Sequence, residues 1–156
     1  EYPAVATLAL GFPRTKVEHP LDGFGVLIPR RLGIPTLGAL FSSTLFPKRA
    51  PDGQVLLTVF LGGAQEAIPQ EEALLFRQAL EDLSPILGIQ GQPSFQRAQL
   101  WPRAIPQYNL GHVQRIAAID SALGDWPGLS LLGNWRGGVA LGDCIRNGWE
   151  AGRIEG

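Results

Sequence analysis

The chain has 156 residues, of which 45% are hydrophobic and 17% charged, enough for one ordinary domain with a core of its own. Its 13 basic and 14 acidic residues give a net charge of -1 without any basic cluster that could follow a phosphate backbone, which argues against nucleic acid as a partner. The single cysteine, Cys144, excludes an internal disulfide and favours a reduced, cytoplasmic setting. No apolar run approaches the roughly 18 residues of a membrane-spanning helix, so any membrane association is expected to be peripheral.

Four short apolar runs in the first 61 residues are predicted to be β-strands. They cover residues 4–12, 25–29, 36–43 and 55–61. Turn-forming residues separate the runs, for example at residues 49–53. The pattern predicts a sheet that is at least partly antiparallel.

From Pro69 the apolar residues recur every three or four positions, which predicts a helix with one buried face. The apolar side chains on that face are Phe76, Ala79, Leu80 and Leu83. Glu71 and Glu72 favour the helix N-terminus through their negative charge, and Pro85 and Gly88 are expected to end the helix.

The rest of the chain is predicted to hold two strands and two helices in alternation. The strands are expected at residues 95–101 and 129–132, and the helices at 113–123 and 139–151. A glycine-rich loop joins the last strand to the last helix, which gives the order strand, loop, helix that ends many ligand-binding units.

This loop, residues 133–142, contains glycines that could let the backbone approach a ligand closely. A helix N-terminus presents unpaired N–H groups and a partial positive charge, which stabilise an anion or the charge that develops on a flavin during its reduction. The GxGxxG dinucleotide fingerprint is absent from the sequence, and the same glycines could form a simple tight turn. The spacing alone leaves both interpretations open.

Several motifs in a fixed order resemble those of the oxygen-dependent protoporphyrinogen oxidases in the flavin amine oxidase superfamily. The motifs are Gly23-Phe24-Gly25, Leu45-Phe46-Pro47 with Ala50-Pro51, Leu61-Gly62-Gly63-Ala64, Ile105-Pro106-Gln107-Tyr108 with Leu110-Gly111-His112, and Gly133-Asn134 followed by residues 138–146. The resemblance extends from Tyr2 to Gly152 and matches the C-terminal part of such an enzyme. The absence of Met and the start directly ahead of an apolar strand also indicate a piece of a longer polypeptide.

The resemblance implies an α+β fold in two parts. Residues 1–98 would be part of a substrate-binding domain, a mixed and partly antiparallel sheet with a helix. Residues 99–156 would be a connecting segment and the last strand and helix of a Rossmann-like FAD-binding domain. The remainder of the enzyme chain would supply the GxGxxG loop, the basic residue for a substrate carboxylate and the membrane-associating helices.

The resemblance also implies two sets of site residues. Flavin contacts would come from Gly138, Val139 and Ala140, supported by Gly133 and Asn134, with Trp101 near the ring. Substrate contacts would come from Phe24, Gly25, Leu27, Leu40 and Phe60. Without the resemblance, apolar residues such as these on strands would be interpreted as core packing.

The implied reaction is the oxidation of protoporphyrinogen IX to protoporphyrin IX in haem or chlorophyll biosynthesis, with hydride passing to FAD and then to oxygen. The cofactor supplies the chemistry, so no catalytic side chain is assigned. His19 and His112 have no ligand-like spacing, and no metal is expected. Arg136 and Arg146 could meet a substrate carboxylate or a flavin phosphate, or form surface ion pairs.

Two alternatives to this oxidase remain open from the sequence. The chain could be a noncatalytic fragment that binds a tetrapyrrole or a protein partner, with its half-site exposed as an apolar patch. It could also belong to another flavin amine oxidase. Assembly into a homodimer is compatible with each of them.

Overall fold

The computed structural model describes residues 1–64 and 68–153, and it divides into two compact units. The sheet unit comprises Ala4–Pro102, and the helical unit comprises Glu1–Pro3 together with Arg103–Gly156. Each unit is described by itself below.

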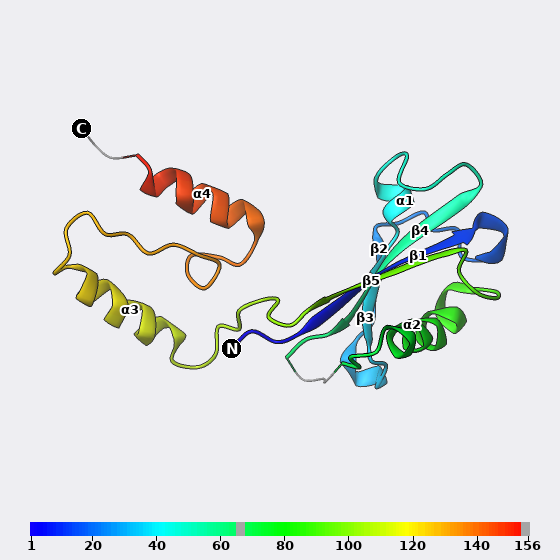
Figure 1. Cartoon of the computed structure of the whole chain (residues 1–156), viewed down its shortest axis with the longest axis horizontal. Helices are drawn as coiled ribbons and strands as arrows, with labels where there is room; N and C mark the ends of the chain where they lie inside the picture. Colours follow the sequence, from blue (N-terminus) through cyan, green and yellow to red (C-terminus); the bar gives the residue numbers. More distant parts are fainter. Residues whose placement is uncertain (65–67, 154–156) are drawn as a thin grey trace. The chain divides into compact units, whose positions relative to one another are not determined.

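Among the described residues of the sheet unit, five strands form one sheet in the order β2-β3-β4-β1-β5 (Figure 1). The strands are β1 (Val5–Pro13), β2 (Gly25–Leu27), β3 (Thr36–Leu40), β4 (Gln54–Gly62) and β5 (Phe95–Trp101). The sequence predicted all five, and the α+β fold class is confirmed. The sheet expected to be partly antiparallel proves to be antiparallel in each of these pairings, as the short connections between β2, β3 and β4 allow.

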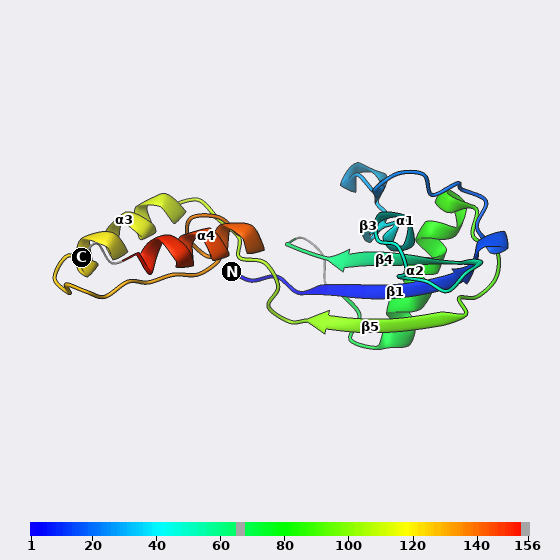
Figure 2. The same cartoon turned by 90° about the horizontal axis from the view of Figure 1, so that it is seen from above.

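The two faces of the sheet differ because successive side chains of a strand point to opposite sides. One face packs against α2 (Glu72–Leu87), as Figure 2 shows, and forms the core. Its central side chains are fully buried: Ala6, Leu8 and Leu10 of β1, and Leu57 and Val59 of β4. The other face, here called the open face, carries the alternate residues of the same two strands: Val5, Thr7, Ala9, Leu56, Thr58 and Phe60.

Helix α2 buries the predicted face and ends at Gly88, one of the two residues expected to end it. Pro85 lies inside the helix, and Gly88 ends it in a left-handed conformation with φ of 61°. A proline has no backbone N–H, so it removes one helical hydrogen bond and crowds the preceding turn. In the last turn of α2 the helix tolerates the loss of this one bond. The backbone N–H of Ile89 then donates to the carbonyl of Ser84 at 3.1 Å, which closes the end.

Three short elements complete the sheet unit: η1 (Arg14–Lys16), η2 (Arg30–Leu32) and α1 (Ser42–Leu45). Helix α1 follows β3 directly in the chain and lies next to β4, where β3 no longer pairs with that strand. The backbone N–H of Leu56 donates to Ser43 Oγ at 3.0 Å, and the hydroxyls of Ser42 and Thr58 lie 2.7 Å apart. A side chain thus satisfies a strand amide where β3 has ended.

The helical unit contains α3 (His112–Leu123) and α4 (Leu141–Ala151), close to the two helices predicted. The strand expected at residues 129–132 does not form. A strand needs a hydrogen-bonded neighbour, and the described residues of the helical unit include no other strand to pair with it. Apolar character at 129–132 therefore did not suffice to make a strand.

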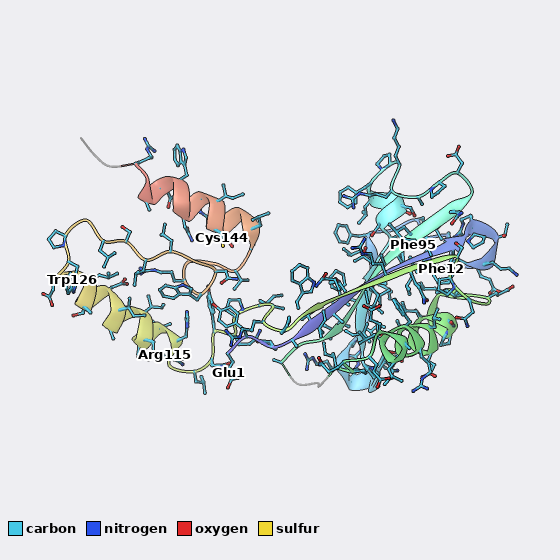
Figure 3. All side chains as sticks on the ribbon, in the orientation of Figure 1. Glu1, Phe12, Phe95, Arg115, Trp126 and Cys144 are labelled. Atoms are coloured by element: carbon cyan, nitrogen blue, oxygen red, sulfur yellow. The ribbon has the colours of Figure 1, made fainter. Side chains whose placement is uncertain are left out.

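Burial separates the two units sharply. Every buried residue of the apolar core among the described residues belongs to the sheet unit, including Phe12, which Figure 3 labels. In α3 and α4 no residue is buried. Large apolar side chains are exposed, for example Trp149 in α4 and Trp126 in the loop after α3. None of the described helices is long and apolar enough to cross a membrane.

Candidate functional site

Four of the five residues predicted to contact substrate occupy neighbouring positions on the open face. Across β2 and β3, Gly25 pairs with Leu40 and Leu27 pairs with Gly38. Gly38 in turn pairs with Phe60 of β4. Their neighbours along each strand pack into the core on the other side: Val26, Ala39, Val59 and Leu61. The antiparallel register therefore brings residues 13 to 35 positions apart in the sequence onto one surface.

The surface they form is apolar and exposed. Leu27 is 84% exposed and Phe24, which directly precedes β2, is 70% exposed. Phe60 and Leu40 are half-buried. A contiguous apolar patch on a sheet face marks a place where a ligand or another protein surface binds.

Trp101, predicted to lie near a flavin ring, belongs to the same open face. It pairs with Val5 at the end of β5 and is half exposed. Its indole Nε1 donates to Thr7 Oγ1 at 3.2 Å, and Thr7 pairs with Phe60 on the other side. This hydrogen bond fixes the indole beside the predicted substrate residues.

Glycine is required at two positions of β2 and β3. A Cβ atom at Gly25 would overlap the carbonyl oxygen of Ala39, and one at Gly38 would overlap the carbonyl oxygen of Val26. The two backbones approach so closely here that a side chain would push the strands apart. The resemblance had assigned Gly25 to substrate contact. The structure gives this glycine a second role, because the absence of a side chain allows β2 and β3 to pair closely.

A bulge in β3 sets which residues reach the open face. Between Thr36 and Gly38 the register with β4 shifts by one residue. The buried N–H of Thr36 donates to Asp82 Oδ2 of α2 at 3.0 Å, and Asp82 Oδ1 accepts from Gln78 at 2.9 Å. Helix α2 thus holds the strand at the position where its register changes.

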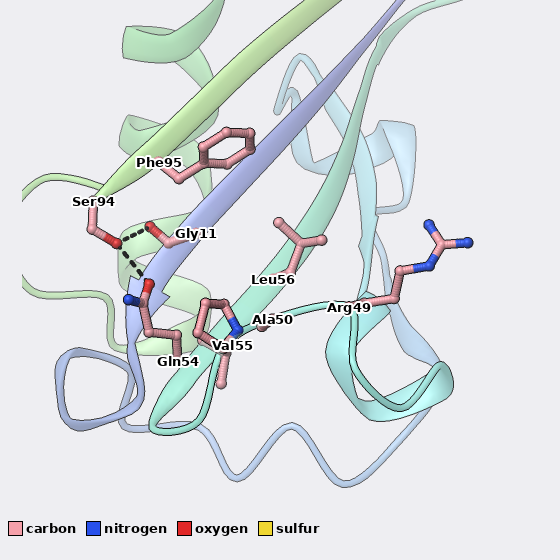
Figure 4. Close-up of a pocket in the computed structure, with 9 residues that line it drawn as sticks. Gly11, Arg49, Ala50, Gln54, Val55, Leu56, Ser94 and Phe95 are labelled. Carbon is pink, nitrogen blue, oxygen red and sulfur yellow. Dashed lines mark hydrogen bonds between the residues drawn. The ribbon is translucent and has the colours of Figure 1, made fainter.

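The far end of the open face contains a hollow of about 450 Å³ (Figure 4). Its lining is Gly11, Arg49, Ala50, Pro51, Gln54, Val55, Leu56, Ser94 and Phe95. Ser94 Oγ lies 3.2 Å from the Gly11 carbonyl and 3.0 Å from Gln54 Oε1, so it bridges two polar groups of the lining. Phe95 begins β5 and Trp101 ends it, so hollow and indole lie at opposite ends of the face.

The predicted flavin loop lies in the helical unit, where the structure brings Gly133, Asn134, Gly138, Val139 and Ala140 together ahead of α4. Contacts from three directions hold its turn. Arg136 NH2 pairs with Asp120 Oδ1 of α3 at 2.7 Å, and Asn147 of α4 donates to the Gly137 carbonyl at 3.3 Å. The hydroxyl of Tyr108 contacts both ends of the turn.

The backbone after this turn offers a row of hydrogen-bond donors. No N–H of residues 139–143 has an acceptor within the described parts of the chain, and Ala140 at the N-cap provides no side-chain cap. Because these groups stand at the positive end of the α4 dipole, they suit an oxygen that carries or gains negative charge. Asp143 in the first turn is neutralised by Arg146, 2.8 Å away.

Both arginines form ion pairs, which favours the surface interpretation of their role. Arg136 pairs with Asp120, and Arg146 pairs with Asp143. Each guanidinium thus has a carboxylate partner within its own unit, as the surface interpretation expected.

Tyr108 is the functional candidate that sequence reasoning did not single out. It appeared as the last residue of the 105–108 motif, without a role of its own. The signal that could have found it is the motif itself, since a tyrosine just after a buried proline and just before a helix is well placed to reach an adjacent loop.

No group of three or more His, Cys, Asp or Glu side chains in residues 1–64 and 68–153 is arranged to hold a metal ion. Trp101 and the predicted substrate residues share the sheet unit, and the other predicted flavin residues share the helical unit.

Known proteins match this chain over nearly its whole length. The family model for flavin containing amine oxidoreductases matches residues 1–153. A chloroplastic protoporphyrinogen oxidase of Oryza sativa subsp. japonica is 38% identical and matches 96% of this chain, and protoporphyrinogen oxidase 2 of Arabidopsis thaliana gives the same values. A coproporphyrinogen III oxidase of Bacillus subtilis is 32% identical over 95% of the chain. The chain spans about 30% of the length of these relatives.

Solved structures show the same fold. A candidate protoporphyrinogen oxidase from Exiguobacterium sp. 255-15 superposes with a TM-score of 0.78 at 24% identity, covering 93% of this chain and 32% of that one. A reduced UDP-galactopyranose mutase gives a TM-score of 0.55 at 12% identity, over 80% of this chain and 26% of that one.

Proposed function

The chain belongs to the flavin-containing amine oxidoreductase family, and on this premise we propose that it is part of an FAD-dependent oxidase that converts protoporphyrinogen IX to protoporphyrin IX. The relatives named protoporphyrinogen oxidase, at up to 38% identity over nearly the whole chain, support this substrate. The proposal assigns residues 1–98 to the substrate domain and residues 99–156 to the end of the FAD domain.

The row of N–H groups at residues 139–143, which have no acceptor among the described residues, is the observation that carries the flavin assignment. Free N–H donors at the positive end of a helix dipole fit the pyrimidine side of an isoalloxazine, where negative charge develops. When bound, FAD supplies the oxidation chemistry, and oxygen is the proposed final acceptor. Gly133 and Asn134 shape the turn, and Val139 and Ala140 present the donors.

The open face supports the substrate assignment. A porphyrinogen is a large ring with an apolar rim, and the surface formed by Phe24, Leu27, Leu40 and Phe60 offers apolar contact without buried charge. Trp101 extends this surface at the end of β5, and we assign it to the neighbourhood of the flavin ring. The protein's part is to orient the substrate and exclude water.

A second substrate is favoured by a specific observation. Relatives named coproporphyrinogen III oxidase match this chain too, one from Bacillus subtilis at 32% identity and one from Propionibacterium freudenreichii at 36% over 71% of the chain. The two porphyrinogens differ in the number of carboxylate side chains, so the same apolar face could serve either ring.

The test uses the complete flavoenzyme that carries this chain. We expect the purified protein to contain bound FAD and to oxidise protoporphyrinogen IX faster than coproporphyrinogen III, measured by porphyrin fluorescence under air. Replacing Phe60 by Ala should raise the KM for the porphyrinogen by about tenfold or more, because a large apolar contact is lost, while FAD content stays unchanged. Glu81→Ala on the exposed surface of α2 is the control, because α2 packs against the other face of the sheet.

A colourless protein that binds no added FAD would contradict the flavin assignment. Preference for coproporphyrinogen III would leave the flavin site intact and replace the substrate by the second candidate. An unchanged KM in Phe60→Ala would remove the open face from the substrate site.

A further inference from the structure

The hydroxyl of Tyr108 bridges the two ends of the turn that precedes α4. It donates to the backbone carbonyl of Asn134 at 3.0 Å, and it accepts from the backbone N–H of Gly138 at 3.3 Å. One phenol oxygen thus uses its donor and an acceptor site on two backbone groups four residues apart. The oxygen therefore holds the two ends of the turn together. The turn also has an internal hydrogen bond, from the N–H of Arg136 to the Gly133 carbonyl.

The position of the Tyr108 ring is itself determined by its surroundings. Pro106, two residues earlier, is buried and restricts the backbone. The ring stacks on His112, the first residue of α3, with centroids 4.1 Å apart and planes inclined by 12°. The hydroxyl therefore reaches the turn from a ring held by packing, which makes it a rigid support.

The bridge also determines which backbone donors remain available. Gly138 N–H is occupied by Tyr108, whereas the N–H groups of the next five residues have no acceptor among the described residues. The unpaired row therefore begins directly after the bridged residue. A shift of Gly138 would move the start of the row with it.

We propose that Tyr108 is a positioning residue for the flavin. Its hydroxyl holds Gly138 against Asn134 and so aims the N–H groups that follow at the pyrimidine side of the ring. The inference rests on the proposed flavin site and goes beyond it by giving a function to the 105–108 motif. Tyr108 acts through the loop and does not itself take part in the chemistry.

Replacing Tyr108 by Phe removes the bridge and leaves the rest of the loop supported. The stack on His112 remains, as do the Arg136–Asp120 ion pair and the bond from Asn147 to the Gly137 carbonyl. We therefore expect the variant to fold. Tyr2→Phe is the matched control, because its hydroxyl contacts only the side-chain Oδ1 of Asn134, at 3.4 Å, and leaves the loop backbone untouched.

In the complete flavoenzyme, Tyr108→Phe should raise the Kd for FAD by roughly tenfold, since two backbone hydrogen bonds are lost. The midpoint potential of the bound flavin should become more negative, because misaligned N–H donors stabilise added charge less well. At saturating FAD, kcat should fall while the KM for porphyrinogen stays the same, since the proposed substrate residues belong to the sheet unit. Tyr2→Phe should match the wild type in all three measurements.

A measurement on the wild-type apoprotein makes the test independent of the variant. The Gly138 amide should exchange with deuterium more slowly than the Gly137 amide, because only Gly138 donates to Tyr108. Equal exchange of the two amides, or a flavin potential and Kd in Tyr108→Phe equal to those of Tyr2→Phe, would overturn the inference while leaving the flavin site in place. A wild-type enzyme without affinity for FAD would instead refute the proposed function.

Discussion

Gly138 joins the proposed flavin loop to α4 in a conformation that other residues rarely adopt. Its φ is 120°, and a Cβ atom there would lie 2.7 Å from Asp143 Cβ and 2.5 Å from Asp143 Cγ. The conflict arises inside the protein, before any cofactor is considered. Glycine at this position therefore serves the local backbone as well as the space proposed for the flavin ring.

We expect Gly138→Ala to remove most of the bound FAD from the complete flavoenzyme, measured by flavin absorbance per protein after purification. The backbone would have to leave its positive φ and Asp143 would have to move, so the N–H groups of residues 139–143 would lose their alignment. Gly148→Ala, in open space within α4, should keep full FAD content and stabilise the helix by about 0.5–1 kcal/mol. FAD content of Gly138→Ala equal to that of Gly148→Ala would show that this loop does not hold the flavin.

At the scale of elements, α2 controls the register of β3. The half-buried Asp82 accepts the N–H of the fully buried Thr36 at the bulge, from which Gly38 and Leu40 proceed to the open face. Without that acceptor, a buried amide would lack a partner, and the bulge that sets the register would lose its anchor.

Asp82→Ala should lower the free energy of unfolding by about 1–3 kcal/mol, as expected when a buried donor loses its acceptor. Urea unfolding followed by circular dichroism measures the change. The neighbouring Glu81→Ala removes an exposed ion pair with Arg77, 3.7 Å apart, and should change stability by less than about 0.5 kcal/mol. Equal losses in the two variants would mean that Asp82 is not the anchor of the bulge.

At the scale of the whole molecule, the apolar core lies on one side of the unit boundary. The sheet unit buries β1 and β4 against α2, whereas α3 and α4, of 12 and 11 residues, bury no residue. Isolated helices shorter than about 12–15 residues are marginal in water. The stability of this chain therefore resides in the sheet unit.

Hydrogen exchange of the 156-residue chain by mass spectrometry should show this difference. Amides of β1 and β4 should exchange slowly, because they open only when the core unfolds, and amides of α3 and α4 should exchange near unfolded rates. Within the complete flavoenzyme, α3 and α4 should become protected as their apolar faces are covered. Strong protection of α4 in the isolated chain would show that the helical unit needs no further partner.

The sequence by itself determined the elements whose residues carry their own signal. The apolar runs at residues 4–12 and 55–61 predicted β1 and β4, and the three and four residue spacing predicted the buried face of α2, because side-chain burial in a helix follows this period. The order of motifs indicated the family, which the comparisons confirm. The 129–132 segment was predicted wrongly as a strand, since apolar character does not provide a hydrogen-bonded neighbour.

Only the tertiary structure decided how distant residues combine. The β3 bulge held by Asp82, the alignment of Leu27, Gly38 and Phe60 in one row, and the bridge from Tyr108 to Asn134 and Gly138 all join residues far apart in the chain. Such contacts depend on strand register and on distances across turns, which local residue preferences do not encode. The sequence thus located most of the strands and helices, and the fold determined which of their atoms meet.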